Sequence, residues 1–281
     1  MLESLLLTKI NESQGLFKFD FQFLQDGLRL ILLYLRKINR QTKTRFLMGK
    51  IVVAIDGYSG CGKSSTAKAV AKKLGFTYID SGAMYRAVTL HFLNHFLTPS
   101  NPKDVEKGLK TLEISFHPNP DTQRQETYLN GLNVEDEIRS MRVSERVSEL
   151  ATIKEIRKEL VAQQQRLGRK KGVVMDGRDI GSVVFPDAEL KVFMSADLET
   201  RAVRRQQELL EKGESVDLEE IKNNLTERDR IDSSRSESPL IKMQDAIEID
   251  TSNLTFEGQV AQIVQLAKAI IEKEQDHAGN H

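Results

Sequence analysis

The stretch Ile51-Val-Val-Ala-Ile-Asp-Gly-Tyr-Ser-Gly-Cys-Gly-Lys-Ser-Ser65 determines how the rest of the chain can fold. Its first five residues are apolar and mostly β-branched, a pattern typical of a strand that is buried on both faces. A glycine-rich turn follows, and a helical pattern begins at Ser64. The spacing Gly57-x-x-x-x-Gly62-Lys63-Ser64 matches the P-loop in its strand–loop–helix context. We therefore predict a site for the phosphates of ATP or GTP.

Each part of the predicted P-loop has a physical role in phosphate binding. Glycines allow backbone N–H groups to converge on a phosphate without an intervening Cβ, and the positive end of the following helix adds to their field. Lys63 is predicted to bridge the β- and γ-phosphates, and the Ser64 hydroxyl to ligate Mg²⁺. The loop residues expected to contact the nucleotide are Gly57, Tyr58, Ser59, Gly60, Cys61, Gly62, Lys63, Ser64 and Ser65.

The composition is that of a soluble globular protein. The 281 residues suffice for one α/β domain with insertions or for two small domains. Lys plus Arg and Asp plus Glu number 41 each, so no net basic charge favours nucleic acid as a partner. The single cysteine, Cys61, excludes an internal disulfide and a cysteine-rich metal site. We expect a cytoplasmic enzyme that does not bind nucleic acid.

Residues 1–47 differ in pattern from the rest of the chain. Alternating phenylalanines are followed by an apolar run from Leu28 to Leu35, which is too short for a membrane span and is interrupted by Arg29. The run also lacks the flanking residues of a signal peptide. Three interpretations stay open: an untranslated or unstructured leader before a start at Met48, a peripheral membrane anchor, or helical packing on the domain. We expect no stable membrane association.

Strand and helix patterns alternate along the remainder of the chain. Helical periodicity is continuous over Val143–Arg166, and a shorter helix is expected over Asp217–Leu225. The five predicted strands are Ile51–Ile55, Phe76–Asp80, Gly172–Asp176, Leu190–Met194 and Ala246–Asp250. This alternation predicts a three-layer α/β fold, with a five-stranded parallel sheet between helices on both faces.

One segment interrupts this alternation. Glu113–His117, Glu126–Asn130 and Leu132–Val134 have the alternating pattern of exposed strands, and Asn130-Gly131 is a tight-turn signal. We therefore predict a small antiparallel β insert in the parallel fold.

Charged residues follow the predicted strands at their carboxyl ends, where α/β sheets bind ligands. Asp176 ends a buried strand and fits the role of an acidic group near Mg²⁺. Arg178 comes directly after that strand. Transfer of a phosphoryl group between two anions requires such positive charge. The chain downstream has no Asn-Lys-x-Asp motif, which counts against a GTPase.

Three motifs closely resemble those of bacterial cytidylate kinases, and the resemblance covers Gly49 to about Lys273. They are Asp80-Ser-Gly-Ala-x-Tyr-Arg86, Asp176-Gly-Arg-Asp-x-Gly-x-Val-Val-Phe-Pro186 and Arg228-x-x-x-Asp232-x-x-Arg235. Their order, with the β insert between the first two, makes the resemblance specific. The family more often has proline at the position of Tyr58 and threonine at that of Ser65, but neither difference removes a phosphate-binding group.

The resemblance implies transfer of the ATP γ-phosphoryl group to CMP or dCMP, with Mg²⁺. The residues it implies around the cytosine are Ser81, Ser148, Arg157 and Asp179. Those implied at the acceptor phosphate are Arg86, Arg178 and Arg235, and those at the sugar are Arg228 and Asp232. A mobile lid over ATP would contribute Arg201, Arg204 and Arg205. The implied catalytic set is Lys63, Asp176, Arg178 and Arg235.

The resemblance also implies how the chain is divided. Residues 1–47 would be an N-terminal extension and residues 48–281 the kinase domain. Within that domain, residues 104–147 would form approximately the insert that binds the monophosphate, and residues 196–236 approximately the lid. A monomer is expected. The chemistry agrees with cytosine as the base, because an ionised Asp179 accepts from its exocyclic amine and opposes the carbonyl oxygen of uracil.

Two alternatives stay open at this point. A non-catalytic P-loop protein could use ATP as a switch, with residues 1–47 docking on a membrane or partner, but the intact Lys63, Ser64 and Asp176 argue against it. A kinase for uridylate or shikimate is the enzymatic alternative. Shikimate kinase has a smaller insert, and the residues implied around the base would have no purpose in it.

Overall fold

The computed structural model describes residues 49–120, 125–211 and 213–278. The predictions for residues 1–47 lie outside the described residues. In the part of the chain that is described, no helix has the length and apolar character needed to cross a membrane.

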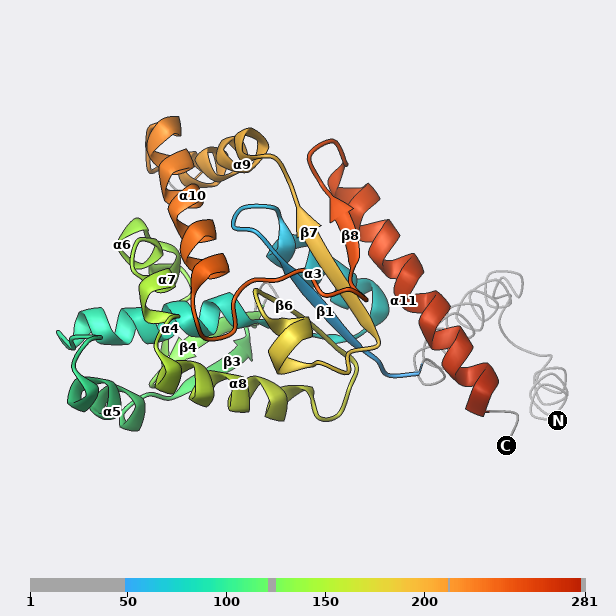
Figure 1. Cartoon of the computed structure of the whole chain (residues 1–281), viewed down its shortest axis with the longest axis horizontal. Helices are drawn as coiled ribbons and strands as arrows, with labels where there is room; N and C mark the ends of the chain where they lie inside the picture. Colours follow the sequence, from blue (N-terminus) through green and yellow to red (C-terminus); the bar gives the residue numbers. More distant parts are fainter. Residues whose placement is uncertain (1–48, 121–124, 212, 279–281) are drawn as a thin grey trace, which may run out of the picture. The chain divides into compact units, whose positions relative to one another are not determined.

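A parallel sheet forms the centre of the domain and confirms the predicted fold class (Figure 1). Its five strands lie in the order β2-β6-β1-β7-β8. The strands are β1 (Val52–Gly57), β2 (Thr77–Asp80), β6 (Val173–Gly177), β7 (Leu190–Ser195) and β8 (Ile247–Asp250). β1 is the middle strand and is buried at all six positions, as its unbroken apolar run predicts.

The pairing register brings carboxylates together at one edge of this sheet. Asp176 on β6 is the register partner of Asp80 on β2 and of Ile55 on β1, and Asp56 is opposite Gly177. Because the strands are parallel, the P-loop after β1 leaves the sheet at this same edge. The sheet therefore places the three acidic side chains next to the predicted nucleotide site.

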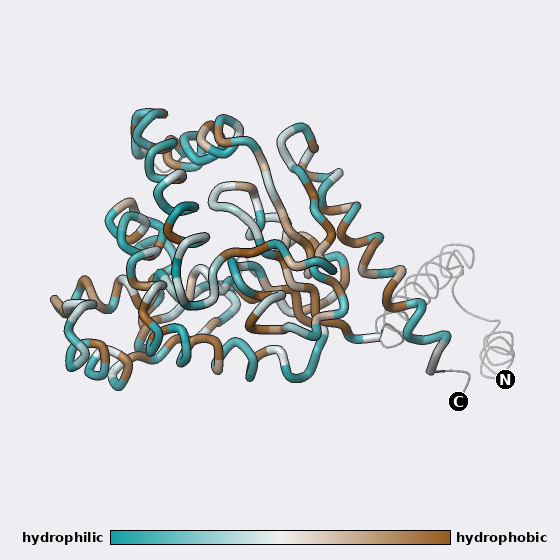
Figure 2. Tube along the Cα trace, viewed as in Figure 1, coloured by the Kyte–Doolittle hydropathy of each residue, from teal (hydrophilic) through white to brown (hydrophobic). Residues whose placement is uncertain are grey.

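Helices cover both faces of the sheet (Figure 1). The P-loop helix α3 (Lys63–Leu74) packs on β1, β2 and β6 and ends at Gly75, whose left-handed backbone has φ 70°. The last helix, α11 (Phe256–Ala278), packs against α3 and β7. The opposite face is covered by α4 (Ser81–Asn94) and a short π-helix η2 (Ile180–Val184), with α8 (Lys154–Gly168) against η2. Figure 2 shows hydrophobic residues concentrated along the central strands and α11.

The predicted insert is a separate three-stranded antiparallel sheet. Helix α5 (Pro102–Lys110) precedes its strands, which are β3 (Ile114–Pro118), β4 (Gln125–Leu129) and β5 (Leu132–Asn133). Asn130 and Gly131 join β4 to β5 with φ 50° and 80°, the left-handed conformation that this tight turn requires. The prediction of an antiparallel insert is confirmed.

The single helix predicted over Val143–Arg166 is wrong. This region follows a short 3₁₀ turn η1 (Glu137–Arg139) and contains α6 (Met141–Ser144), α7 (Val147–Leu150) and α8. Ile153, just before α8, has an extended backbone with ψ 119°. The break exposes the Ala151 carbonyl, which accepts a 2.9 Å hydrogen bond from the Arg157 guanidinium. At this point the Ala151 carbonyl therefore bonds to the Arg157 side chain and not to a backbone N–H of a continuous helix.

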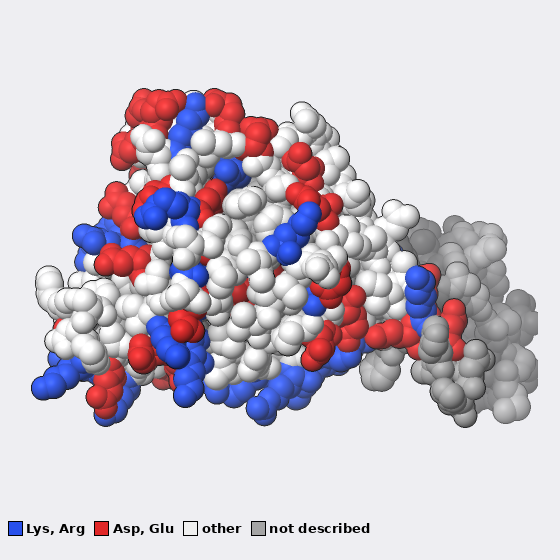
Figure 3. Space-filling view, in the orientation of Figure 1, with Lys and Arg blue, Asp and Glu red and all other residues white. Residues whose placement is uncertain are grey.

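A second difference concerns the charged segment after Leu225. The helix predicted over Asp217–Leu225 continues as α10 (Leu218–Ser234), so Arg228 and Asp232 lie on its last turns. Asp217 caps its start by accepting from two backbone N–H groups. α10 packs against α9 (Leu198–Leu210) through a small apolar cluster of Ala202, Leu209, Ile221 and Leu225. On the face in Figure 3, basic and acidic side chains are interspersed over these two helices.

Candidate active site

The P-loop owes its shape to backbone conformations that favour glycine. Gly57 has φ 147°, and a Cβ there would lie 1.9 Å from the carbonyl oxygen of Met194 on β7. Gly60 and Gly62 have φ 76° and 86°, and Gly62 is the N-cap of α3. The loop therefore needs Gly57 for close packing on the neighbouring strand, in addition to the access for phosphate that the sequence predicts.

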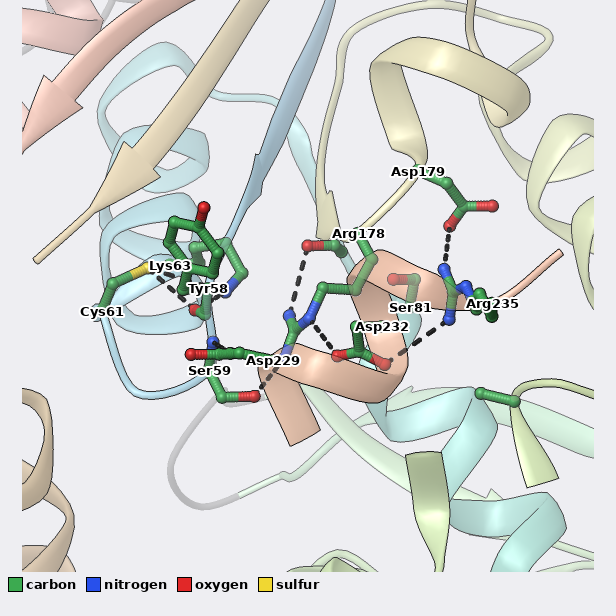
Figure 4. Close-up of polar contacts among 12 residues, drawn as sticks. Tyr58, Ser59, Cys61, Lys63, Ser81, Arg178, Asp179, Asp229, Asp232 and Arg235 are labelled. Carbon is green, nitrogen blue, oxygen red and sulfur yellow. Dashed lines mark hydrogen bonds and ion pairs between the residues drawn. The ribbon is translucent and has the colours of Figure 1, made fainter. Parts of the chain in front are cut away.

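Lys63 is buried in the turn of this loop, with a relative exposure of 6%. Its Nζ donates a 2.5 Å hydrogen bond to the carbonyl oxygen of Tyr58 (Figure 4). Burial, and then the nearby positive charge of Arg178, lower the pKa of Lys63. An ammonium group held in such a place interacts strongly with an anion, because little water screens it.

Ser64 and Asp176 form the part of the site that suits a divalent cation. The Ser64 hydroxyl donates to Oδ2 of Asp176 at 2.7 Å, and the Tyr78 hydroxyl donates to Oδ1 at 2.9 Å. Burial, and then the adjacent Asp80 carboxylate, raise the pKa of Asp176. A hydroxyl and a carboxylate are the hard oxygen ligands that Mg²⁺ prefers. Among the described residues there is no cluster of three or more His, Cys, Asp or Glu side chains that could hold a metal alone.

A cavity beside the P-loop contains all the acceptor residues that the family resemblance implies. It lies between the ends of β2 and β6 and the helices α4, α7, α8 and α10. Its lining includes Ser81, Arg86, Ser148, Arg157, Arg178, Asp179, Arg228, Asp232 and Arg235. Residues from four separate parts of the sequence thus meet at one place.

A chain of ion pairs runs through this cavity to the P-loop (Figure 4). Asp179 is paired with Arg157 and lies 3.9 Å from Nη2 of Arg235. Arg235 Nη1 lies 3.6 Å from Oδ1 of Asp232. Arg178 then donates from Nε to Oδ2 of Asp232 at 2.8 Å, and from Nη2 to the Ser59 hydroxyl at 2.6 Å. Arg178 therefore connects the cavity directly to the loop.

Hydrogen bonds to neighbouring groups fix Arg86 and Ser81, and Ser148 lies in the same cavity wall. Arg86 donates from Nη1 to the Ile138 carbonyl at 3.2 Å and to the Ser144 hydroxyl at 2.9 Å. Burial, and then the charge of Arg228, lower the pKa of Arg86. Ser81 donates to the carbonyl of Asp176 at 2.5 Å. Ser148 is buried on α7 at the cavity wall.

A second cavity covers the P-loop and adjoins the first. It is lined by Asp176, by Arg205 of α9 and by the loop residues Ser59, Gly60, Gly62, Lys63, Ser64 and Ser65. The residues that line both cavities are Gly82, Arg86, Gly177, Arg178 and Arg228. A triphosphate on the loop and an anion in the first cavity would share these arginines, as transfer of a phosphoryl group between them requires.

Comparison with known proteins agrees with this geometry. Residues 53–269 match the family model for cytidylate kinase, which is more than half of the chain. This chain belongs to the cytidylate kinase family. A cytidylate kinase from Cytophaga hutchinsonii is 58% identical over 220 residues, which are 78% of this chain and 94% of that protein. Those from Bacteroides thetaiotaomicron and Parabacteroides distasonis are each 52% identical, over 75% and 79% of this chain and 94% and 99% of those proteins.

The three arginines that the family resemblance assigns to the lid have three different environments. Arg201 donates to the carbonyl of Ser59 at 3.0 Å and to Oδ2 of Asp229 at 2.5 Å. Arg204 donates to the Thr251 hydroxyl at 3.2 Å and to the Thr251 carbonyl at 2.7 Å, and that hydroxyl in turn donates to the Cys61 carbonyl of the loop. Arg205 lines the P-loop cavity and donates to the Arg139 carbonyl at 3.4 Å. Although the three arginines lie close together on α9, each one therefore binds a different partner.

Tyr58, at the loop position where the family resemblance leads us to expect proline, packs against two neighbouring side chains. Its ring meets Phe193 edge-on at 5.6 Å between centroids. The Arg201 guanidinium lies 5.5 Å from the centre of the same ring, within the range of a cation–π contact. Tyr58 thus joins the P-loop to β7 and to the first of the lid arginines.

Two acidic residues that hold segments next to the cavities were not predicted from the sequence. Asp229 accepts from the backbone N–H of Ser59 at 3.1 Å and also binds Arg201, so it links α10 to the P-loop. Asp56 accepts from the backbone N–H groups of Ile180 and Gly181. The only sequence signal for Asp56 is a charged residue at the end of an otherwise apolar strand. Asp229 has no such signal, since it lies in a run of alternating charges.

Proposed function

We propose that this protein transfers the γ-phosphoryl group of ATP to CMP or dCMP, giving ADP and CDP or dCDP. Membership of the cytidylate kinase family supports this activity, as do the names of relatives that share most of their length with the chain. The structural observation that carries it is the pair of adjoining cavities with Arg178 in both walls. One cavity has the P-loop for a donor triphosphate, and the other has the buried arginines for an acceptor monophosphate.

The proposed reaction needs alignment and positive charge rather than a general base. An oxygen of the acceptor phosphate, already an anion, forms a bond to the γ-phosphorus while the bond from that phosphorus to the β,γ-bridging oxygen breaks. Lys63 and Arg178 are the cations beside the P-loop that would stabilise the migrating phosphoryl group. Arg235 and Arg86 would hold the acceptor phosphate from the other side of the cavity.

The same geometry suits a magnesium ion and a cytosine base. Ser64 and Asp176 would hold Mg²⁺ together with phosphate oxygens, and the ion would neutralise charge on the donor. Asp179 keeps lone pairs free beside Arg157 and Arg235, because an ionised carboxylate offers about four acceptor positions. These positions suit the exocyclic amine of cytosine, with Ser81 and Ser148 on the same wall.

We further propose the domain boundaries that the family resemblance implies. Residues 1–47 would be an N-terminal extension to the kinase domain, within which about residues 104–147 would form the acceptor-binding insert and about residues 196–236 the mobile lid. The protein would act as a monomer in the cytoplasm on small-molecule substrates. Sedimentation at the working concentration measures the oligomeric state, and a dimer would contradict that part.

A panel of acceptors tests the proposed function. ADP formation is followed with CMP, dCMP, UMP and AMP as acceptors, and with shikimate as a control from the other kinase class. We expect kcat/KM for CMP and dCMP to exceed those for UMP and AMP by about 100-fold or more. Equal activity on UMP and CMP would contradict the assignment of the base, and ATP binding without ADP formation would favour a non-catalytic switch.

A further inference from the structure

Asp56, the last residue before the P-loop glycines, has a carboxylate buried deep in the domain. Its relative exposure is 6%. Oδ1 accepts from the backbone N–H of Ile180 at 2.8 Å, and Oδ2 accepts from that of Gly181 at 2.7 Å. Both oxygens are therefore used by a segment that lies far away in the sequence, directly after Arg178 and Asp179.

Those two N–H groups are ones that a helix cannot satisfy by itself. Ile180 and Gly181 begin η2, and the first N–H groups of a helix normally bond to the side chain of the N-cap residue. The N-cap here is Asp179, a good capping residue by type, yet its side chain makes no capping hydrogen bond. It is instead paired with Arg157 in the acceptor cavity. Asp56 supplies the cap that Asp179 does not.

The contact between Asp56 and η2 is tightly fitted. A Cβ at Gly181 would lie 3.3 Å from Oδ2 of Asp56 and 3.2 Å from the side chain of Lys191. At Gly177, on the other side of Asp179, a Cβ would lie 2.5 Å from the Ser81 hydroxyl. The segment that carries Arg178 and Asp179 is thus held at both ends, with Asp56 as the partner of one end.

Burial disfavours the ionised form of the Asp56 carboxylate. Desolvation raises the pKa of Asp56 to about 6, although both backbone hydrogen bonds and Lys63 lower it. The nearby Asp179 carboxylate adds to the rise. An apolar or amide side chain would fill this space at a smaller electrostatic cost. A role in packing alone does not explain an acid at this position.

We propose that Asp56 is a positioning residue for the acceptor site: by capping η2 it frees the Asp179 side chain to face the acceptor base. The inference rests on the proposed function, since it assigns a second residue to the same recognition. The contact also couples the two cavities. Asp56 lies on β1, which leads into the P-loop, and it holds the start of η2, which follows Arg178 and Asp179 in the acceptor cavity. Asp56 itself lines neither cavity.

The variant Asp56→Asn tests this role with little change in volume. Its amide offers one acceptor in place of two, and its NH₂ group would face a backbone N–H. Asp179 would then compete for the open capping position. We expect KM for CMP to rise about tenfold and the preference for CMP over UMP to fall by a similar factor, while KM for ATP changes less than about twofold. An equal rise in both KM values, or no change in either, would overturn the proposal.

Glu189→Gln is the matched control. Oε2 of Glu189 accepts from the backbone N–H of Val52 at 2.8 Å, at the other end of β1 from Asp56. Like Asp56→Asn, this substitution replaces a carboxylate with an amide. Glu189 hydrogen-bonds to β1, the strand that contains Asp56, and it lines neither cavity. We expect both KM values to stay within about twofold of the wild type. A tenfold rise in KM for CMP here would show that any loss of charge along β1 disturbs the acceptor site.

Two further measurements keep the test decisive. Gly181→Ala places a methyl group next to Oδ2 of Asp56 and so disturbs the same contact without changing any charge. This variant replaces Asp56→Asn in the test if Asp56→Asn does not fold. An unchanged KM for CMP in that variant would count against the proposal. Calorimetric binding of CMP separates the two hypotheses. Wild-type protein that binds CMP but forms no CDP contradicts the proposed function, whereas unchanged CMP affinity in Asp56→Asn contradicts only the inference.

Discussion

The Ser64 hydroxyl donates a 2.7 Å hydrogen bond to Oδ2 of Asp176, which joins the first turn of α3 to the end of β6. Both groups are hard oxygen ligands, and the bond already holds them at the distance at which two groups can share one cation. This pair is the basis of the first prediction.

Ser64→Ala should make the enzyme depend on a higher concentration of Mg²⁺. Loss of one ligand oxygen should raise the Mg²⁺ concentration at half-maximal rate about tenfold and lower kcat about 10–100-fold. A titration of Mg²⁺ at fixed ATP and CMP measures both. Ser252→Ala is the control, because Ser252 donates to Asp250 at the same 2.7 Å on the exposed end of β8. An unchanged Mg²⁺ dependence in Ser64→Ala would remove Ser64 from the metal site.

Lys63→Ala should abolish turnover and leave the fold intact. The side chain is the buried cation of the P-loop, so kcat should fall about 1,000-fold or more. Because burial lowers the pKa of Lys63, removing its charge should not lower the melting temperature. Lys242→Ala, which breaks an exposed ion pair with Glu248, should change neither quantity. A rate within tenfold of the wild type would contradict the role given to Lys63.

Asp179→Asn should lose most of the preference for CMP over UMP. An amide can donate to the carbonyl oxygen of uracil as well as accept from cytosine, so the ratio of the two kcat/KM values should fall about 10–100-fold. The same change leaves Arg157 without its carboxylate partner and should lower the free energy of unfolding by about 3 kcal/mol. The control Asp187→Asn alters an exposed acid of the same region. If Asp179→Asn keeps its selectivity, another residue distinguishes the bases.

Asp56 should make stability depend on pH in a defined direction. Burial raises its pKa to about 6, so between about pH 4 and 6 the native protein binds more protons at this group than the unfolded chain does. The free energy of unfolding must then fall as pH rises through that window. Relative to Asp56→Asn, the wild type should lose about 2 kcal/mol between pH 4 and pH 7. Urea unfolding of both proteins at several pH values measures the difference, and parallel curves would contradict the assigned pKa.

A chain that begins at Met48 should retain full activity. The family match starts at residue 53, and the similarity to the Cytophaga hutchinsonii relative spans 94% of that protein with 220 residues. We therefore expect kcat/KM for CMP to stay within about twofold of that of the full chain. A larger loss would assign residues 1–47 a part in folding or catalysis.

The local patterns of this sequence predicted most of the fold. All five strands and the antiparallel insert were predicted because alternation, apolar runs and the Asn130-Gly131 turn are local signals. The helix predicted over Val143–Arg166 was wrong because periodicity does not reveal the break before Ile153. At that break the Ala151 carbonyl accepts a hydrogen bond from the Arg157 guanidinium, a contact that exists only in the folded domain.

The candidate site was predictable where a motif marks it and not elsewhere. Motif positions such as Arg178 and Asp179 meet in one cavity as the family resemblance implies. Asp56 and Asp229 carry no motif of their own, and each accepts from backbone N–H groups, Asp56 from Ile180 and Gly181 and Asp229 from Ser59. A hydrogen bond to a backbone N–H does not depend on the type of the partner residue, so the sequence does not indicate it. Such contacts can be identified only in the folded structure.

The strand order β2-β6-β1-β7-β8 has a consequence for how the chain emerges from a ribosome. β1 is made first among these five strands, yet its two neighbours are β6 and β7, so Val52 does not meet its strand partner until Val173 has been synthesised. The apolar run before the P-loop must therefore remain unpaired through more than a hundred residues of translation. Nascent chains halted before β6 should bind chaperones through this run, and nucleotide binding should appear only after β7 has left the exit tunnel.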